Sequence, residues 1–131
     1  MNNKKFFVLY VLPVILFCSF IIYLSSMQNI PTLRGVVSTK PVEPGSWTGD
    51  DIEHLVLYGI LAFLFYRAFV QSQYAKHAFL ATVLFCVVFG FFDELHQSFV
   101  PTRTMSLRDI LWNFIASLTS RFSSVLIKKE Q

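Results

Sequence analysis

The segment from residue 6 to residue 24 (FFVLYVLPVILFCSFIIYL) is an apolar run without a single charged side chain. At about 1.5 Å per helical residue, such a run crosses the roughly 30 Å hydrocarbon core of a bilayer. It follows Lys4 and Lys5, it is too long for the core of a signal peptide, and no A-x-A-like cleavage site follows it. We therefore expect a retained first membrane span with its amino end in the cytoplasm, bent at Pro13.

Three further apolar segments follow, at about residues 52–70, 77–97 and 109–127. The chain is 54% hydrophobic and only 15% charged, against roughly 25% charged residues in soluble domains. A chain of this size cannot hide so much apolar surface in one small globule. We predict a single all-α domain over residues 1–131, a bundle of four transmembrane helices that passes several times through the cell membrane.

The third segment places carboxylates at the edge of the membrane. Its apolar run, residues 78–92, is shorter than the twenty or so residues that a span needs. To cross the bilayer, the helix must include Asp93 and Glu94 and reach about Gln97. Ionisable groups at this depth are costly and typically functional.

The distribution of basic residues predicts the topology. With the amino end inside, the two ends and the middle link are cytoplasmic, and the outer segments are a long Pro- and Gly-rich loop between the first two helices and the link after Pro101. Seven basic residues would then lie inside: Lys4, Lys5, Arg67, Lys76, Arg121, Lys128 and Lys129. Four would lie outside: Arg34, Lys40, Arg103 and Arg108. This arrangement, with both ends in the cytoplasm, obeys the positive-inside rule.

Polar residues recur at helical spacing on three of the predicted helices, at similar depth. Intervals of three or four residues place each set on one helical face. The predicted site residues are Asp50, His54 and Tyr58 on the second helix, Asp93, Glu94 and Gln97 on the third, Arg103 in the link, and Asp109 and Asn113 on the fourth. If these faces meet, they form one outward-facing ligand pocket. The alternative is a purely structural network, because polar groups in lipid must satisfy one another.

The residue types allow several kinds of chemistry. His54 and Glu94 are candidates for a general acid/base pair. The planar guanidinium of Arg103 could bind a carboxylate or phosphate of a ligand through two N–H groups. Alternatively, Arg103 forms an ion pair with Glu94 or Asp109. His54, Glu94 and Asp109 together could bind a metal, but no HExxH or CxxC motif supports this, so we expect a site without metal or cofactor. The basic residues form no stripe with aromatics between them, which argues against nucleic acid as a partner.

Two motifs in this chain resemble the VanZ-like family of small bacterial membrane proteins. They are D-x-x-x-H-x-x-x-Y at residues 50–58 and D-E-x-x-Q-x-x-x-P-x-R-x-x-x-x-x-D-x-x-x-N at residues 93–113. The chain departs from the family pattern at Asp51, where relatives usually carry a basic residue, and at Ala116 and Ser120, where they usually carry glycine. The resemblance implies a four-span membrane protein. The namesake of the family confers low-level resistance to teicoplanin, a glycopeptide that acts outside Gram-positive cells.

Three functions fit these features. The first is a non-enzymatic envelope protein that binds an amphiphilic glycopeptide or a lipid-linked wall precursor at the outer leaflet and lowers the access of the drug to its target. The second is a membrane-embedded hydrolase or transferase acting on a lipid-linked or cell-wall intermediate, with Glu94 or His54 as base and Arg103 steering an anionic group. The third is a scaffold without a small ligand.

Overall fold

The structure, a computed structural model, describes residues 2–27, 49–101, 103 and 105–127, and all regular secondary structure within them is helical. The elements are α1 (Asn3–Phe6), a π-helical turn (Phe7–Val11), α2 (Leu12–Ser25), α4 (Gly49–Val70), a 3-10 turn (Ala75–His77), α5 (Ala78–Gln97), α6 (Leu107–Leu118) and α7 (Ser120–Leu126). The predicted long loop between the first two spans falls almost entirely on residues 28–48, which lie outside the described part.

Within the described residues, three continuous helical segments are long and apolar enough to cross a membrane. They are Asn3–Ser25, Asp51–Val70 and Ala75–Gln97, and they coincide with the first three predicted spans. The third includes both carboxylates and ends at Gln97, as the shortness of its apolar run required.

The fourth apolar segment is helical but interrupted at Thr119, between α6 and α7. Around the break, the hydroxyls of Ser117, Thr119 and Ser120 each donate to the backbone carbonyl three residues earlier. Such side-chain bonds compete with the regular helical ladder. Neither piece alone has the roughly twenty residues of a span, so a fourth crossing stays a prediction.

A π turn lies at the position where Pro13 was expected to disturb the first span. Proline lacks an N–H, and its ring clashes with the carbonyl four residues earlier, so a regular α-helix cannot pass through it unchanged. The π turn Phe7–Val11 lies just ahead of Pro13. Tyr10, within this turn, is buried and carries the guanidinium of Arg67 from α4 over its ring, 4.7 Å from the centroid.

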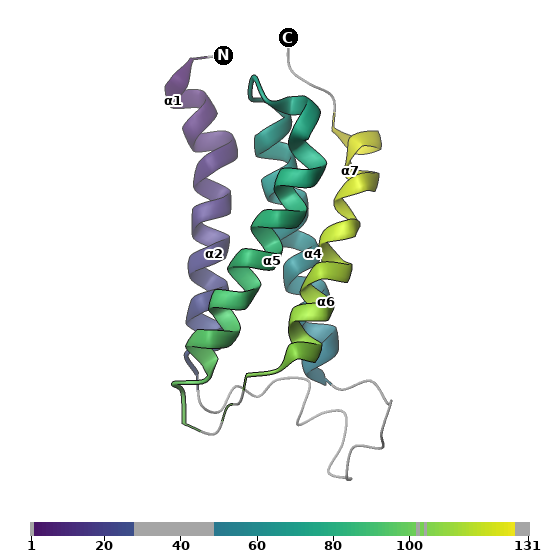
Figure 1. The fold of residues 1–131 in the computed structure, drawn as a ribbon. Helices are drawn as coiled ribbons and strands as arrows, with labels where there is room; N and C mark the ends of the chain where they lie inside the picture. The colour runs from purple at the N-terminus through teal and green to yellow at the C-terminus, as the bar shows by residue number, and fades with distance from the viewer. Residues whose placement is uncertain (1, 28–48, 102, 104, 128–131) are drawn as a thin grey trace.

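The helices run side by side along one bundle axis (Figure 1). The start of α1, the α4–α5 link and the end of α7 lie at one end, and the α5–α6 link lies at the other. Helix α4 packs against α2, α5, α6 and α7, so it forms the centre of the bundle. Its Tyr58, Leu61 and Ala62 are fully buried in the core with Cys86 of α5 and Ala116 of α6.

Helix α5 shows how the bundle is suited to lipid. Its outer face carries Leu80, Leu84, Val88 and Phe92, four residues apart and 57, 56, 53 and 59% exposed. Its inner face carries Thr82, Cys86, Gly90 and Glu94, which are all buried. Large apolar side chains outside and polar ones inside are the arrangement expected of a helix that faces hydrocarbon.

Candidate functional site

The described site residues gather at the end of the bundle that carries the α5–α6 link. They come from the first turns of α4, the last turn of α5, the link, and the first turns of α6. Asp50 belongs to α4, but its side chain lies outside the described part of the chain. The other eight form two groups. We name them the histidine cluster (His54, Glu94, Asp109 and Asn113) and the arginine chain (Tyr58, Asp93, Gln97 and Arg103).

His54 is the centre of the histidine cluster. Its Nδ1 lies 2.9 Å from Oδ1 of Asn113, and because an amide oxygen only accepts, Nδ1 carries the proton and donates. Its Nε2 faces two carboxylates, 3.5 Å from Oε1 of Glu94 and 3.9 Å from Oδ2 of Asp109. The amide of Asn113 thus fixes the imidazole and directs its second nitrogen at the acids.

The start of α6 holds Glu94 in place. Glu94 is fully buried, and its Oε2 accepts the backbone N–H of Ser106 at 2.8 Å. Ser106 is the N-cap of α6, and its hydroxyl accepts the N–H of Asp109 at 3.3 Å. The other oxygen of Glu94, Oε1, accepts no hydrogen bond from the described residues. It points at His54.

A glycine that the sequence reasoning did not single out makes room for the histidine cluster. A Cβ at Gly90 would lie 2.6 Å from Nδ2 of Asn113 and 3.2 Å from Cε1 of Tyr58. Only a residue without a side chain allows Asn113, itself fully buried, to reach His54. The signal was available, because glycine in a helix interior costs about 1 kcal/mol relative to alanine and often marks a close approach.

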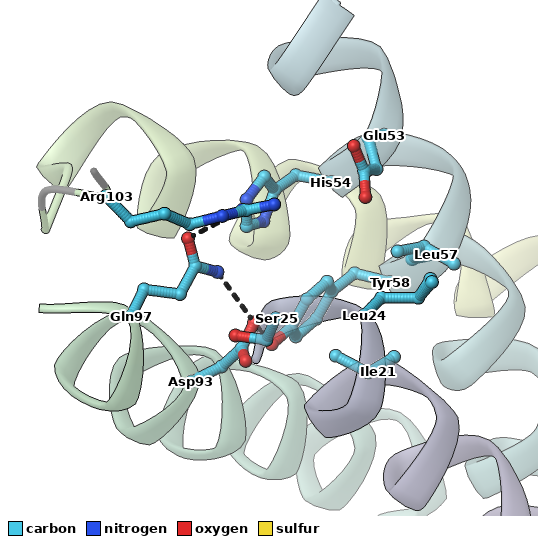
Figure 2. A pocket seen from close by; sticks show the side chains of 10 residues that line it. All are labelled: Ile21, Leu24, Ser25, Glu53, His54, Leu57, Tyr58, Asp93, Gln97 and Arg103. Atoms are coloured by element: carbon cyan, nitrogen blue, oxygen red, sulfur yellow. Dashed lines mark hydrogen bonds between the residues drawn. The ribbon is translucent and has the colours of Figure 1, made fainter. Parts of the chain in front are cut away.

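The arginine chain runs from the core to the link. The hydroxyl of Tyr58 donates to Oδ2 of Asp93 at 3.2 Å, and the amide of Gln97 donates to the same oxygen at 3.4 Å. Arg103 in turn donates to Oε1 of Gln97 at 3.2 Å (Figure 2). Arg103 therefore bonds an amide, and within the described residues it forms no ion pair with Glu94 or any other carboxylate.

A small cavity is lined by His54 of the histidine cluster and by the four residues of the arginine chain (Figure 2). It measures about 20 Å³, and its polar lining includes His54, Asp93, Gln97 and Arg103. The end of α2 contributes Ser25, whose buried hydroxyl has no hydrogen-bond partner among the described residues. A cavity of this size holds about one water molecule. It can admit one small polar group, not a whole glycopeptide.

An ion pair that sequence reasoning did not predict ties α6 to the start of α4. Arg108 donates to Oδ2 of Asp51 at 2.9 Å, and the side chain of Asp51 is only 1% exposed. Asp51 stands where a basic residue is usual in the resembling family, and the opposite charge of Arg108 was the signal that could have suggested the pair.

The arrangement supports three kinds of chemistry. His54 and Glu94 are 3.5 Å apart, close enough to share a proton or to act together on a substrate. Three possible ligand atoms lie within 4.8 Å of one another, one each from His54, Glu94 and Asp109. This spacing could hold a metal ion. Arg103 offers N–H groups to an anion.

A family model described as VanZ/LLP1 matches residues 6–127, a range that includes the histidine cluster and the arginine chain. No curated protein and no solved structure matches the chain.

Proposed function

The chain belongs to the VanZ/LLP1 family, and from this membership and the polar site we propose that it lowers susceptibility to teicoplanin-type glycopeptides. In this proposal it is a multi-pass protein of the cell membrane. Its site faces outward and binds a carboxylate or phosphate of an amphiphilic ligand, either the glycopeptide or a lipid-linked wall precursor. The membership and the apolar helices support a VanZ-like membrane protein, and the ligand is our inference.

The observation that carries this proposal is the position of Arg103. Its side chain is half-buried, lines the cavity and donates to the neutral amide of Gln97. Among the described residues no carboxylate forms an ion pair with it, although Glu53 and Asp93 line the same cavity. A guanidinium held in this way keeps N–H groups available for the planar, two-point contact that carboxylates and phosphates make.

The size of the cavity limits how the ligand binds. Since it holds about one water molecule, only one anionic group can enter, and the apolar remainder of the ligand would lie in the outer leaflet beside the helices. An amphiphile meets both requirements. This supports a membrane-associated ligand over a soluble one.

Teicoplanin susceptibility with a charge-matched pair of variants tests the proposal. The chain is expressed in a susceptible Gram-positive host as wild type, Arg103→Gln and Arg121→Gln. Arg121 is exposed on α7 near Phe79, at the other end of the bundle. We expect Arg103→Gln to return the minimal inhibitory concentration to that of the empty host and Arg121→Gln to keep the protection. Immunoblots normalise for abundance. Full protection by Arg103→Gln at equal abundance, or none by the wild type, contradicts the proposal.

A second function, membrane-embedded acid/base catalysis on a wall intermediate, is favoured by the 3.5 Å approach of His54 Nε2 to Glu94 Oε1. Here the discriminating measurement is turnover. Mass spectrometry of lipid-linked wall precursors would reveal a changed species in cells that express the wild type and its loss in Glu94→Gln. An unchanged precursor profile in the wild type rejects catalysis and leaves binding.

A further inference from the structure

The three ligand-type atoms of the histidine cluster come from three different helices. Nε2 of His54 on α4 lies 3.5 Å from Oε1 of Glu94 on α5 and 3.9 Å from Oδ2 of Asp109 on α6. Ligands of one ion at metal distances of about 2.1 Å lie roughly 3.4 Å apart in tetrahedral geometry. All three atoms lie within 4.8 Å of one another, close to that spacing. From this geometry we propose that His54, Glu94 and Asp109 bind a divalent transition-metal ion of the Zn²⁺ or Mn²⁺ class.

The surroundings already orient two of the three ligands. Asn113 takes the Nδ1–H of His54, which leaves the lone pair of Nε2 directed at the carboxylates. Metal-binding histidines are typically fixed in this way through their other nitrogen. Ser106 holds one oxygen of Glu94 through its backbone N–H, which leaves Oε1 directed inward. Glu94 is fully buried, and Oε1 has no hydrogen-bond partner among the described residues.

The negative charge of the two carboxylates favours binding of a cation in the histidine cluster. Two carboxylates that face each other across a buried imidazole repel one another, and little water screens them, because Glu94 is 0% and Asp109 only 15% exposed in its side chain. A divalent ion offsets two negative charges at once. A bound cation would attract both carboxylates, and Oε1 of Glu94, which accepts no hydrogen bond from the described residues, would become a ligand.

The donor set indicates the class of metal. One imidazole nitrogen with two carboxylate oxygens suits Zn²⁺, Mn²⁺ or Fe²⁺, whereas Ca²⁺ prefers six to eight oxygens. Three protein ligands also leave at least one position open for water or an anionic group. The proposal departs from the metal-free site expected from the sequence. No short sequence motif predicts this metal site, because each ligand comes from a different helix.

Metal binding by the full-length chain tests the proposal. The protein is purified in detergent, treated with chelator, and titrated with Zn²⁺ and with Mn²⁺ by equilibrium dialysis and elemental analysis. We expect one ion per chain for at least one of the two metals. His54→Asn, Glu94→Gln and Asp109→Asn should each lose that site, and Asn113→Ala should weaken it by roughly 10–100-fold because it releases the imidazole.

Two imidazole variants outside the cluster are matched controls. His96 contacts Ser26 through its Nε2, and His77 lies at the other end of α5. His96→Gln and His77→Gln should keep one ion per chain with unchanged affinity. Helical circular dichroism and gel filtration verify that each variant is folded. Equal binding by wild type and by the three ligand variants overturns the proposal, because the ion would then lie elsewhere.

A spectroscopic measurement on the wild type tests the proposal even if the ligand variants do not fold. Co²⁺ added to the metal-free protein should give visible d–d absorption typical of mixed nitrogen and oxygen coordination, and added Zn²⁺ should abolish it. No Co²⁺ spectrum and no bound Zn²⁺ or Mn²⁺ in a folded wild type overturn the proposal. Neither measurement involves antibiotic, so its outcome is separate from the susceptibility test of Arg103.

Discussion

Asn113 is the residue on which the geometry of the histidine cluster depends. It is fully buried on α6, with His54 on one side and Gly90 on the other. Its Oδ1 accepts from the imidazole of α4, while its Nδ2 lies close to α5, where the absence of a side chain at Gly90 leaves room for it. The tautomer and direction of His54 thus depend on a glycine one helix away.

Replacing Gly90 by alanine tests this dependence. The new Cβ would lie 2.6 Å from Asn113 Nδ2, so the amide must move, and overpacking of this kind costs about 1–3 kcal/mol of unfolding free energy. Gly59 on α4 is the matched control, since nothing lies within 4 Å of a Cβ built there. Gly59→Ala should be neutral or slightly stabilising through helix propensity. Thermal unfolding in detergent compares the two variants. Equal stability would show that Asn113 does not need the space.

At the scale of residues, the predicted pair of His54 and Glu94 lies 3.5 Å apart in the structure, but helical spacing did not predict the other partners. His54 and Tyr58 are four residues apart on α4, yet His54 faces Glu94 while Tyr58 bonds Asp93. The choice depends on how α4 and α5 are rotated and shifted along their axes, which short motifs do not encode. The predicted alternatives for Arg103 likewise left out Gln97, its partner in the structure.

At the scale of elements, the first turn of α6 connects three helices. Its N-cap Ser106 gives a backbone N–H to Glu94 of α5, and its Arg108 bonds Asp51 of α4. Asp109 follows directly and faces His54. The position of this one turn therefore determines whether the carboxylates and the imidazole meet.

A double-mutant cycle measures how strongly the ion pair fixes α6. Arg108→Met should cost more stability than Asp51→Asn, because it leaves a 1% exposed carboxylate without its guanidinium, whereas Arg108 is 42% exposed and can turn to water. Because one partner of this ion pair is buried and the other is partly exposed, we expect a coupling free energy between that of a buried pair and that of a surface pair, about 1–2 kcal/mol. The coupling free energy is obtained from chemical unfolding of the wild type, both single variants and the double variant. If the two substitutions change the free energy of unfolding additively, the ion pair does not hold α6.

Element lengths were predictable where membrane thickness constrains them and not where local bonds do. The apolar run of α5 was too short for a span, so its extension to Gln97 followed from the bilayer alone. The interruption at Thr119 did not follow, since serine and threonine occur in unbroken helices too. Hydroxyl bonds to nearby carbonyls surround the interruption and compete with the helical ladder. They are visible only once the backbone is placed.

At the scale of the molecule, the site lies at the end of the bundle opposite the start of α1, the α4–α5 link and the end of α7 (Figure 1). The positive-inside rule predicts that these three face the cytoplasm and that the site faces out. Outward placement matters for the proposed function, because a glycopeptide that acts outside the cell could not meet a cytoplasmic site.

Labelling of single cysteines in intact Gram-positive cells tests this orientation. Cys18 and Cys86 are first replaced by alanine, and then Met105→Cys in the α5–α6 link or Tyr74→Cys in the α4–α5 link is introduced; both positions are exposed, at 39% and 56%. A membrane-impermeant thiol reagent should label Met105→Cys in intact cells and Tyr74→Cys only after permeabilisation. The reverse pattern would place the histidine cluster and Arg103 on the cytoplasmic side. A metal site would still be possible there, but direct capture of a glycopeptide outside the cell would not.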